Sequence, residues 1–188
     1  MFVPDAQLEK AALRQGDIVS MVHLVGCLNL ETIAIAKDGT GRELNWIIPK
    51  PPEYRDAAVL SHSCEIAPEN GIKLTSVILA PVRDIDGATE REKIAELIAS
   101  NAIAPGAAWT FLKYYYLNPN ERLQYAHGAV VDFSKCFSVR KNSYGYLVNK
   151  KVLQMTPESR SSFALKLALY FHRAQEPTVP EAGVAAAV

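Results

Sequence analysis

Apolar residues along most of the chain come in short continuous or alternating runs rich in β-branched side chains, a pattern typical of strands rather than of surface helices. Proline ends several of these runs, because it cannot donate to a strand ladder. Asp38 and Gly39 provide turn chemistry between two of the runs and predict a hairpin there. The expected strands cover residues 17–30, 32–37, 42–49, 57–61, 74–82, 107–117, 126–136 and 144–155.

Three segments carry helix signals. Residues 5–14 are expected to form a short helix that begins after Pro4. Thr89, followed three residues later by Glu92, has the spacing of a capping box and predicts a helix over the apolar positions that follow. Thr156 with Pro157 predicts the start of a closing helix, since proline at the first position needs no N–H partner.

The closing helix has a wide apolar stripe made of Phe163, Leu167, Tyr170 and Phe171. Such a stripe must pack on the sheet or on a partner, so a homodimer or a protein partner bound through this helix is one expectation. Many short strands with few helices predict a mainly β (α+β) domain over residues 1–176, followed by a flexible tail at 177–188. The expected architecture is a small, strongly bent barrel with an inserted helix and the closing helix packed on it.

Composition narrows the class of protein. Of 188 residues, 49% are apolar and 21% charged, and Lys plus Arg equals Asp plus Glu at 20 each. A neutral molecule has no overall basic field for tight, unspecific nucleic-acid binding, although a local basic face remains compatible with it. Three cysteines are poor material for a disulfide framework and favour a reducing, cytoplasmic setting. The N-terminus lacks an apolar signal region, and no stretch approaches the roughly 20 apolar residues of a membrane span.

Three short motifs resemble the PemK/MazF-like toxin family, whose fold is an SH3-like barrel. They are "RQGDIV" at 14–19, "RDAAVLS" at 55–61 and "ILAPV" at 78–82. The resemblance implies metal-independent cleavage of RNA in a bacterial or phage stress or toxin–antitoxin system. It also implies that Arg55 stabilises charge on the phosphate during phosphoryl transfer. The family's partner threonine would follow Val82, where this chain has Arg83.

A second resemblance covers nearly the whole chain. Uncharacterised bacterial and phage proteins combine an "LRQGDI"-like start, a "VVLSQSCDI"-like strand end, a "YLPP…VDF" stretch and a closing helix. The corresponding residues here are 13–18, 59–66, 116–119 with 131–133, and 159–173. This group implies no function.

The stretch "SHSCE" at 61–65 places three reactive side chains where a strand ends. In an extended segment His62 and Cys64 would share one face, and Ser63 and Glu65 the other. An imidazolium beside a thiol favours the reactive thiolate, so a thiol-dependent enzyme or small-ligand protein centred on Cys64, His62 and Glu65 is one hypothesis. The alternatives are a small buried cysteine beside a satisfied histidine, or a metal site. No metal site is predicted, because the three cysteines lie far apart in the sequence, whereas zinc sites commonly use pairs of ligands separated by about two to five residues.

The span 135–151 contains five basic residues, no acid and three aromatic rings. Cations for phosphates and rings for base stacking are what single-stranded nucleic acid requires. The candidate nucleic-acid-binding residues are Arg83, Lys135, Arg140, Lys141, Tyr144, Tyr146, Lys150 and Lys151. The alternative is a solvated hairpin whose tyrosines pack sideways.

These observations leave three hypotheses open, and the sequence does not decide whether the protein is an enzyme. The first is a barrel module that binds RNA or another single-stranded nucleic acid without a metal or cofactor, with cleavage of the strand left open. The second is the thiol-dependent protein centred on Cys64. The third is a non-catalytic interaction module. No membrane partner is expected.

Overall fold

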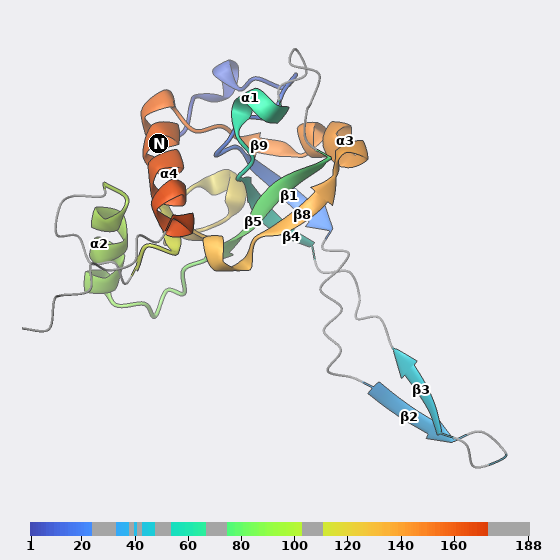
Figure 1. Ribbon diagram of the computed structural model, residues 1–188. Coiled ribbons are helices and arrows are strands. Elements are labelled where there is room, and N and C mark those ends of the chain that lie inside the picture. The colour runs from blue at the N-terminus through green and yellow to red at the C-terminus, as the bar shows by residue number, and fades with distance from the viewer. Residues whose placement is uncertain are drawn as a thin grey trace, which may run out of the picture.

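A seven-stranded antiparallel sheet lies at the centre of the computed structural model (Figure 1), which describes residues 1–23, 33–37, 40, 43–47, 54–66, 75–102 and 111–172. The strands run in the order β6-β7-β5-β4-β1-β9, and β8 pairs with the first half of β5. They are β1 (Ile18–His23), β4 (Tyr54–Val59), β5 (Ser76–Asp84), β6 (Tyr114–Leu117), β7 (Ala129–Asp132), β8 (Phe137–Arg140) and β9 (Lys151–Leu153). Among the described strands β6 and β9 do not pair, so the sheet stays open and the expected closed barrel is not confirmed. The protein is mixed α+β.

A separate two-stranded sheet confirms the predicted hairpin. Strands β2 (Ile33–Lys37) and β3 (Glu43–Ile47) pair antiparallel, with Ile33 opposite Ile47 and Lys37 opposite Glu43. Neither strand pairs with the seven-stranded sheet in the described part of the chain.

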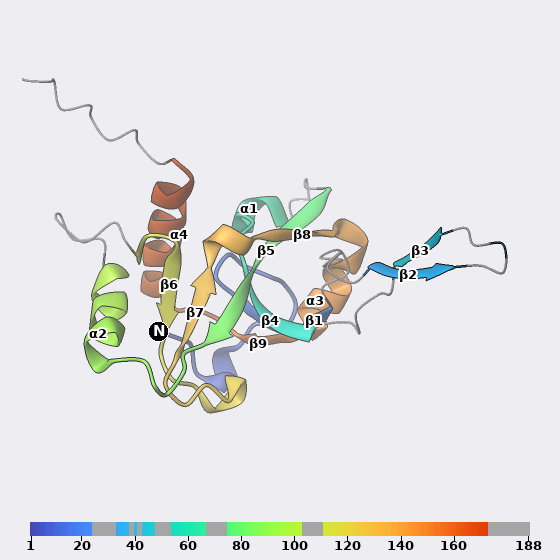
Figure 2. The same cartoon turned by 90° about the horizontal axis from the view of Figure 1, so that it is seen from below.

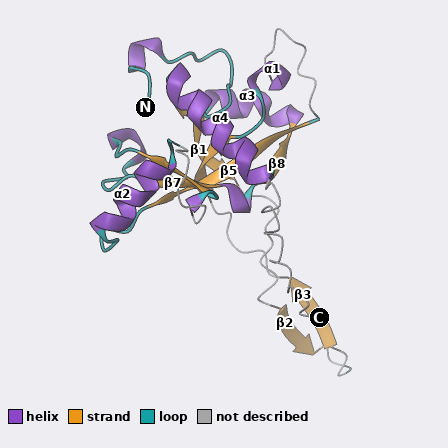
Figure 3. Ribbon diagram, turned by 60° about the vertical axis from the view of Figure 1, so that its left-hand side comes forward, coloured by secondary structure: helices purple, strands orange, loops and turns teal. Residues whose placement is uncertain are grey.

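The described residues form four α-helices beside the central sheet: α1 (Ser63–Ile66), α2 (Arg91–Ser100), α3 (Tyr144–Asn149) and α4 (Pro157–Phe171). Short 3-10 turns are η1 (Asp5–Gln7), η4 (Glu121–Leu123), η5 (Phe133–Lys135) and η6 (Lys141–Ser143). Figure 2 shows α2 beside β6 and α3 at the opposite, β1 end, and Figure 3 shows α4 lying across the sheet. None of the helices in the described segments is both long and apolar enough to cross a bilayer.

Both faces of the middle strands are covered, which explains their continuous apolar runs. On one face Ala80 and Val82 of β5 belong to the cluster that contains Phe163 and Leu167 of α4. On the other face Leu79 packs with residues of α3. A third cluster joins α2 to the β6 end of the sheet through Ile85, Leu97 and Tyr116. The predicted packing of the closing helix on the sheet is thus observed.

Two local predictions were wrong because contacts distant in sequence override local preference. Residues 5–14 form only the short turn η1, since the following backbone bonds to other elements: Glu9 N donates to the Gln154 side chain, and Leu13 N donates to Tyr144 Oη. The expected strand 144–155 begins as helix α3, because Tyr144 and Leu147, three residues apart, both face the core.

The two predicted helix caps have different outcomes. Thr156 caps α4, and its hydroxyl accepts from Ser159 N at 3.3 Å. The capping box at Thr89 does not form, because α2 starts one residue later, after Glu90, without a side-chain cap bond. The expected strand 126–136 is also interrupted after Asp132 by η5.

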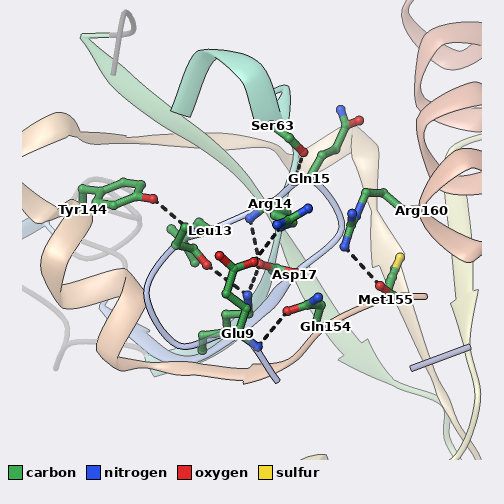
Figure 4. Close-up of polar contacts among 12 residues, drawn as sticks. Glu9, Leu13, Arg14, Gln15, Asp17, Ser63, Tyr144, Gln154, Met155 and Arg160 are labelled. Atoms are coloured by element: carbon green, nitrogen blue, oxygen red, sulfur yellow. Dashed lines mark hydrogen bonds and ion pairs between the residues drawn. The ribbon is translucent and has the colours of Figure 1, made fainter. Parts of the chain in front are cut away.

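The "RQGD" motif forms a tight turn ahead of β1. Asp17 N donates to Arg14 O at 3.0 Å, and Gly16 at the third position has φ +83°. That left-handed conformation is the one a type II turn requires, and glycine adopts it without strain. The Asp17 carboxylate closes the turn by accepting from Arg14 N at 2.7 Å (Figure 4).

A buried ion pair ties this turn to the C-terminal part of the sheet. Lys151 Nζ lies 2.6 Å from Asp17 Oδ2, and both side chains are fully buried. Lys151 also donates to Ala12 O at 3.0 Å. Burial raises the pKa of the Asp17 carboxyl above its ordinary 3.8, although the charges of Lys151 and Arg160 oppose that rise. The pair therefore joins β1 to β9 at the expense of desolvating two charges.

Removing one partner of this pair is expected to be strongly destabilising. Lys151→Met leaves a buried carboxylate without its counter-charge and should lower the free energy of unfolding in urea by about 3–5 kcal/mol. Lys150→Met, at the adjacent and less buried position, is the matched control and should cost about 0.5 kcal/mol or less.

Two further measurements check the cause. The double variant Asp17→Asn with Lys151→Met should lose clearly less than the sum of the two single losses, and strict additivity would contradict the pairing. A carboxyl whose pKa is raised in the folded state contributes its full stabilisation when the pH is below its ordinary pKa of 3.8. That stabilisation is lost as the pH rises through the folded-state pKa. Lys151→Met should therefore recover part of its deficit as pH falls from neutral toward 3.8.

Candidate functional site

The thiol and the imidazole of the "SHSCE" stretch meet at the surface. The chain leaves β4, passes His62 in a loop and enters α1, so the segment is not extended as predicted. His62 Nδ1 nevertheless lies 2.8 Å from Cys64 Sγ, and both residues are exposed. Cys64 is thus not the small buried hydrophobe of the alternative hypothesis.

The loop that carries His62 is braced on both sides by Gln15 of the tight turn. The Gln15 side chain donates from Nε2 to Leu60 O at 2.7 Å. Gln15 N donates to Ser63 Oγ at 3.0 Å, a contact visible in Figure 4. Ser61 Oγ accepts from Ile78 N of β5 at 2.8 Å. Because Asp17 fixes the turn and the turn fixes Gln15, the buried ion pair indirectly positions the His62–Cys64 contact.

The other two candidates near this loop contribute less. Glu65 is half-buried within α1, and its backbone N donates to His62 O at 3.0 Å. Arg55 lies in β4 opposite Val22, but its side chain falls outside what the structure describes. No group of three potential metal ligands occurs among the described histidine, cysteine and acidic residues.

Part of the predicted basic span forms an exposed surface, which we call the basic rim. The rim consists of the exposed residues Lys135, Arg140, Lys141 and Tyr146 together with the half-buried Lys150. Lys135, Arg140 and Lys141 are exposed along η5, β8 and η6, which follow one another in the chain. Tyr146 is 44% exposed, and Lys150 Nζ lies 5.9 Å from its ring centroid.

Tyr144 and Lys151 were predicted to face nucleic acid, and the structure places both inside the protein. Tyr144 packs against β1 and β5 residues, and its hydroxyl accepts from Leu13 N at 3.0 Å. Lys151 is the partner of Asp17. Tyr144 is buried because the segment 144–149 is a helix with its own buried face, which the strand interpretation could not anticipate. Lys151 is buried because β9 pairs with β1 and brings this lysine against Asp17.

Arg83 lies in a separate group of side chains, the cation–tyrosine cluster, formed by Arg83, Lys113, Tyr114 and Asp132. Arg83 forms an ion pair with Asp132, which is 1% exposed. Tyr114 lies directly opposite Asp132 in the β6–β7 pairing. The Tyr114 ring centroid is 4.9 Å from Lys113 Nζ and 5.9 Å from the Arg83 guanidinium carbon.

The electrostatics of this cluster favour negative charge. Burial alone would raise the pKa of Tyr114, but hydrogen bonds with Arg83 and Lys113, together with their charges, outweigh burial and lower it below its ordinary value of 10.0. Two cations thus surround the phenol oxygen, and the one carboxylate of the cluster is buried.

Sequence reasoning missed Lys113, Tyr114 and a buried lysine on α4. Lys166 is 1% exposed, and its Nζ donates to Ser100 Oγ at 2.7 Å. Burial lowers the pKa of Lys166 to about 8. The available signal was spacing, because position 166 falls between Phe163 and Tyr170 on the apolar side of the helix. Lys113 and Tyr114 gave no local signal, since only strand pairing brings them near Arg83.

The tyrosines at 144 and 146 provide a matched test of buried and exposed roles. Tyr144→Phe leaves the Leu13 N–H buried without its acceptor and should lower the free energy of unfolding by about 1–3 kcal/mol. Tyr146→Phe removes an exposed bond to Met21 O and should change it by about 0.5 kcal/mol or less. Urea unfolding of both variants measures the difference, and equal losses would contradict the assignment of Tyr144 to the core.

Comparisons with known proteins add no family to this geometry. No protein-family model matches the chain. A search of curated proteins likewise returns no match.

Proposed function

We propose that the protein is a module that binds single-stranded nucleic acid, with RNA as the ligand, through the basic rim. The observation that carries the proposal is that Lys135, Arg140 and Lys141, which lie on the consecutive elements η5, β8 and η6, are all exposed, while Phe133, Phe137 and Val139 of the same segment turn toward the core. No acidic residue occurs between Lys135 and Lys151 in the sequence. Cations spaced along a continuous surface can follow a phosphate backbone without reading its bases.

The aromatic component of the rim supports the same ligand. Tyr146 is held by its hydroxyl, which donates to Met21 O at 3.0 Å, while nearly half of the residue stays exposed. A ring fixed in this way loses little conformational freedom when a base stacks on it. Lys150 lies beside the ring and adds positive charge where the adjacent phosphate would lie.

The resemblance to PemK/MazF-like toxins suggests a setting for this binding. We propose that the open sheet is a variant of their SH3-like barrel, and that the protein acts in a bacterial or phage stress or defence system. On the same resemblance, Arg55 would stabilise a phosphate during metal-independent cleavage. The hydroxyl that the family places after Val82 is replaced by Arg83, which pairs with Asp132. Binding is therefore the primary proposal, and cleavage is a separate outcome to be measured.

Charge reversal on the rim tests the proposal. Each single-strand phosphate contact adds about 0.7 to the steepness of the plot of log affinity against log salt. Three contacts give a slope of roughly −2, so that a fourfold rise in salt weakens binding about fifteenfold. The variant Arg140→Glu with Lys141→Glu should bind labelled single-stranded RNA more weakly and with a flatter slope. Fluorescence anisotropy across a salt series measures both.

The control for this experiment is Lys10→Glu, which reverses an exposed charge outside the rim and should leave affinity and slope unchanged. RNA length on a denaturing gel, with a chelator present, shows in the same samples whether the strand is cut. Wild-type binding that is absent, or insensitive to salt, would refute the proposed function.

The second candidate function is thiol-dependent chemistry at Cys64. The specific observation in its favour is the 2.8 Å approach of His62 Nδ1 to an exposed Cys64 Sγ, on a loop braced by Gln15. The imidazole is placed to accept the thiol proton, and proton removal is what turns a thiol into a nucleophile. Equivalent bracing on both sides of the loop would keep the two groups in register during a reaction.

Alkylation kinetics distinguish this candidate, with Cys136 as an exposed internal reference. In a Cys27→Ser background, Cys64 should react with iodoacetamide near neutral pH faster than Cys136. His62→Ala should slow Cys64 by roughly tenfold, because an unassisted thiol is only a few per cent thiolate at pH 7. Peptide mass spectrometry gives both rates. Equal rates at the two cysteines, unchanged by His62→Ala, would rule out an activated thiol.

A further inference from the structure

The guanidinium of Arg83 is held firmly and still has donors to offer. One terminal nitrogen pairs with Asp132 Oδ2, and Asp132 Oδ1 accepts from the backbone N and the hydroxyl of Ser134. Both oxygens of the Asp132 carboxylate therefore already have partners within the protein and hold Arg83 in place. Arg83 Nε is buried without a hydrogen-bond partner among the described residues, so a ligand would be met by the terminal nitrogens, which carry further N–H donors on a side chain that is 35% exposed. Its fork geometry suits a tetrahedral oxyanion.

Lys113 and Tyr114 extend the same positive region to the edge strand. Lys113 directly precedes β6 and is exposed, and its Nζ lies 4.9 Å from the Tyr114 ring centroid. Tyr114 and Arg83 come from β6 and β5, and β7 lies between these two strands. The sheet thus fixes the spacing of a guanidinium, a phenol and an ammonium group on one surface.

The cluster has more positive than negative charge where a ligand can reach it. Arg83 and Lys113 contribute two cations, and Asp132, the acid paired with Arg83, is buried. The lowered pKa of Tyr114 reports the same field, because neighbouring cations stabilise an anion at the phenol oxygen. A phosphate oxygen at that place would meet the same stabilisation.

We propose that Arg83, Lys113 and Tyr114 form a binding site for one phosphate group of the bound strand. Arg83 and Lys113 supply charged donors, the Tyr114 hydroxyl donates a third hydrogen bond, and Asp132 is a positioning residue that orients Arg83. The inference rests on the proposed nucleic-acid binding and extends it past Lys135, since η5 joins the Asp132 end of the cluster to the basic rim. The phosphate can be an internal diester, a strand-terminal phosphate or free inorganic phosphate.

The first experiment measures RNA binding to Lys113→Ala and Tyr114→Phe beside wild type. Both variants keep the Arg83–Asp132 pair, so the fold is retained. Lys113→Ala should weaken binding and reduce the steepness of the salt dependence by about 0.7, the value for one phosphate contact. Tyr114→Phe should weaken binding with the slope unchanged, because a neutral donor is lost. Lys10→Ala is the matched control and should behave as wild type.

Ligand variants identify the source of the phosphate. If the site takes a terminal phosphate, 5′-phosphorylated RNA should bind wild type more tightly than 5′-hydroxyl RNA, and Lys113→Ala should abolish that preference. If the site takes an internal diester, the two RNAs should bind equally and both should weaken in the variant. If the wild-type protein, Lys113→Ala and Tyr114→Phe all bind RNA with equal affinity, the proposed phosphate site is refuted and the proposed function is not.

A second experiment reads the site without RNA. Inorganic phosphate bound beside Tyr114 adds negative charge, so it should shift tyrosinate formation, followed by ultraviolet absorbance, to higher pH. The shift should be missing in Tyr114→Phe and in a chloride control of equal ionic strength. A shift without RNA binding supports a site for free phosphate and refutes the proposed function. If the wild-type protein forms tyrosinate at the same pH with and without phosphate, the inference is overturned.

Discussion

The buried contact between Asp17 and Lys151 is the constraint on which the rest of the structure depends. It joins the turn that precedes β1 to β9, the strand at the edge of the sheet. Both charged side chains are fully buried and therefore shielded from water. Such a pair contributes little net stability, yet either charge alone is costly, so the two segments are committed to one arrangement. The turn that Asp17 closes also holds Gln15, which braces the loop of His62 and Cys64.

Coverage of the sheet explains where function can reside. Helices α3 and α4 occupy opposite faces of the central strands, and α2 covers the β6 end. Exposed cations at the periphery of the sheet lie at strand ends: Lys113 just before β6, Lys135 between β7 and β8, and Arg140 at the end of β8. The His62–Cys64 loop, the basic rim and the cation–tyrosine cluster all occupy such positions. A binding site on the periphery of a rigid sheet gains fixed spacing without disturbing the core.

The sequence predicted elements whose signals are local. The β2–β3 hairpin, the apolar strands β4 and β5, and the Thr156 cap of α4 all follow from turn chemistry, periodicity or capping. It misassigned residues 144–149, where a short helical face was mistaken for a strand, and it placed Lys151 at the surface. The candidate site was foreseen only in part. The exposed cations of the rim could be predicted because they are close together in the sequence. The grouping of Arg83 with Lys113 and Tyr114 arises from strand pairing, which a local sequence pattern does not reveal.

The most direct test of the central claim is to map where RNA touches the protein. Single-stranded RNA that carries 4-thiouridine can be photo-crosslinked to the wild-type chain, and the attached peptides identified by mass spectrometry. Nucleic-acid binding by the basic rim predicts crosslinks within residues 134–150 and near Tyr114, and none in α4. Crosslinks confined to α4 or the N-terminal segment, or no crosslinks at low salt, would contradict it.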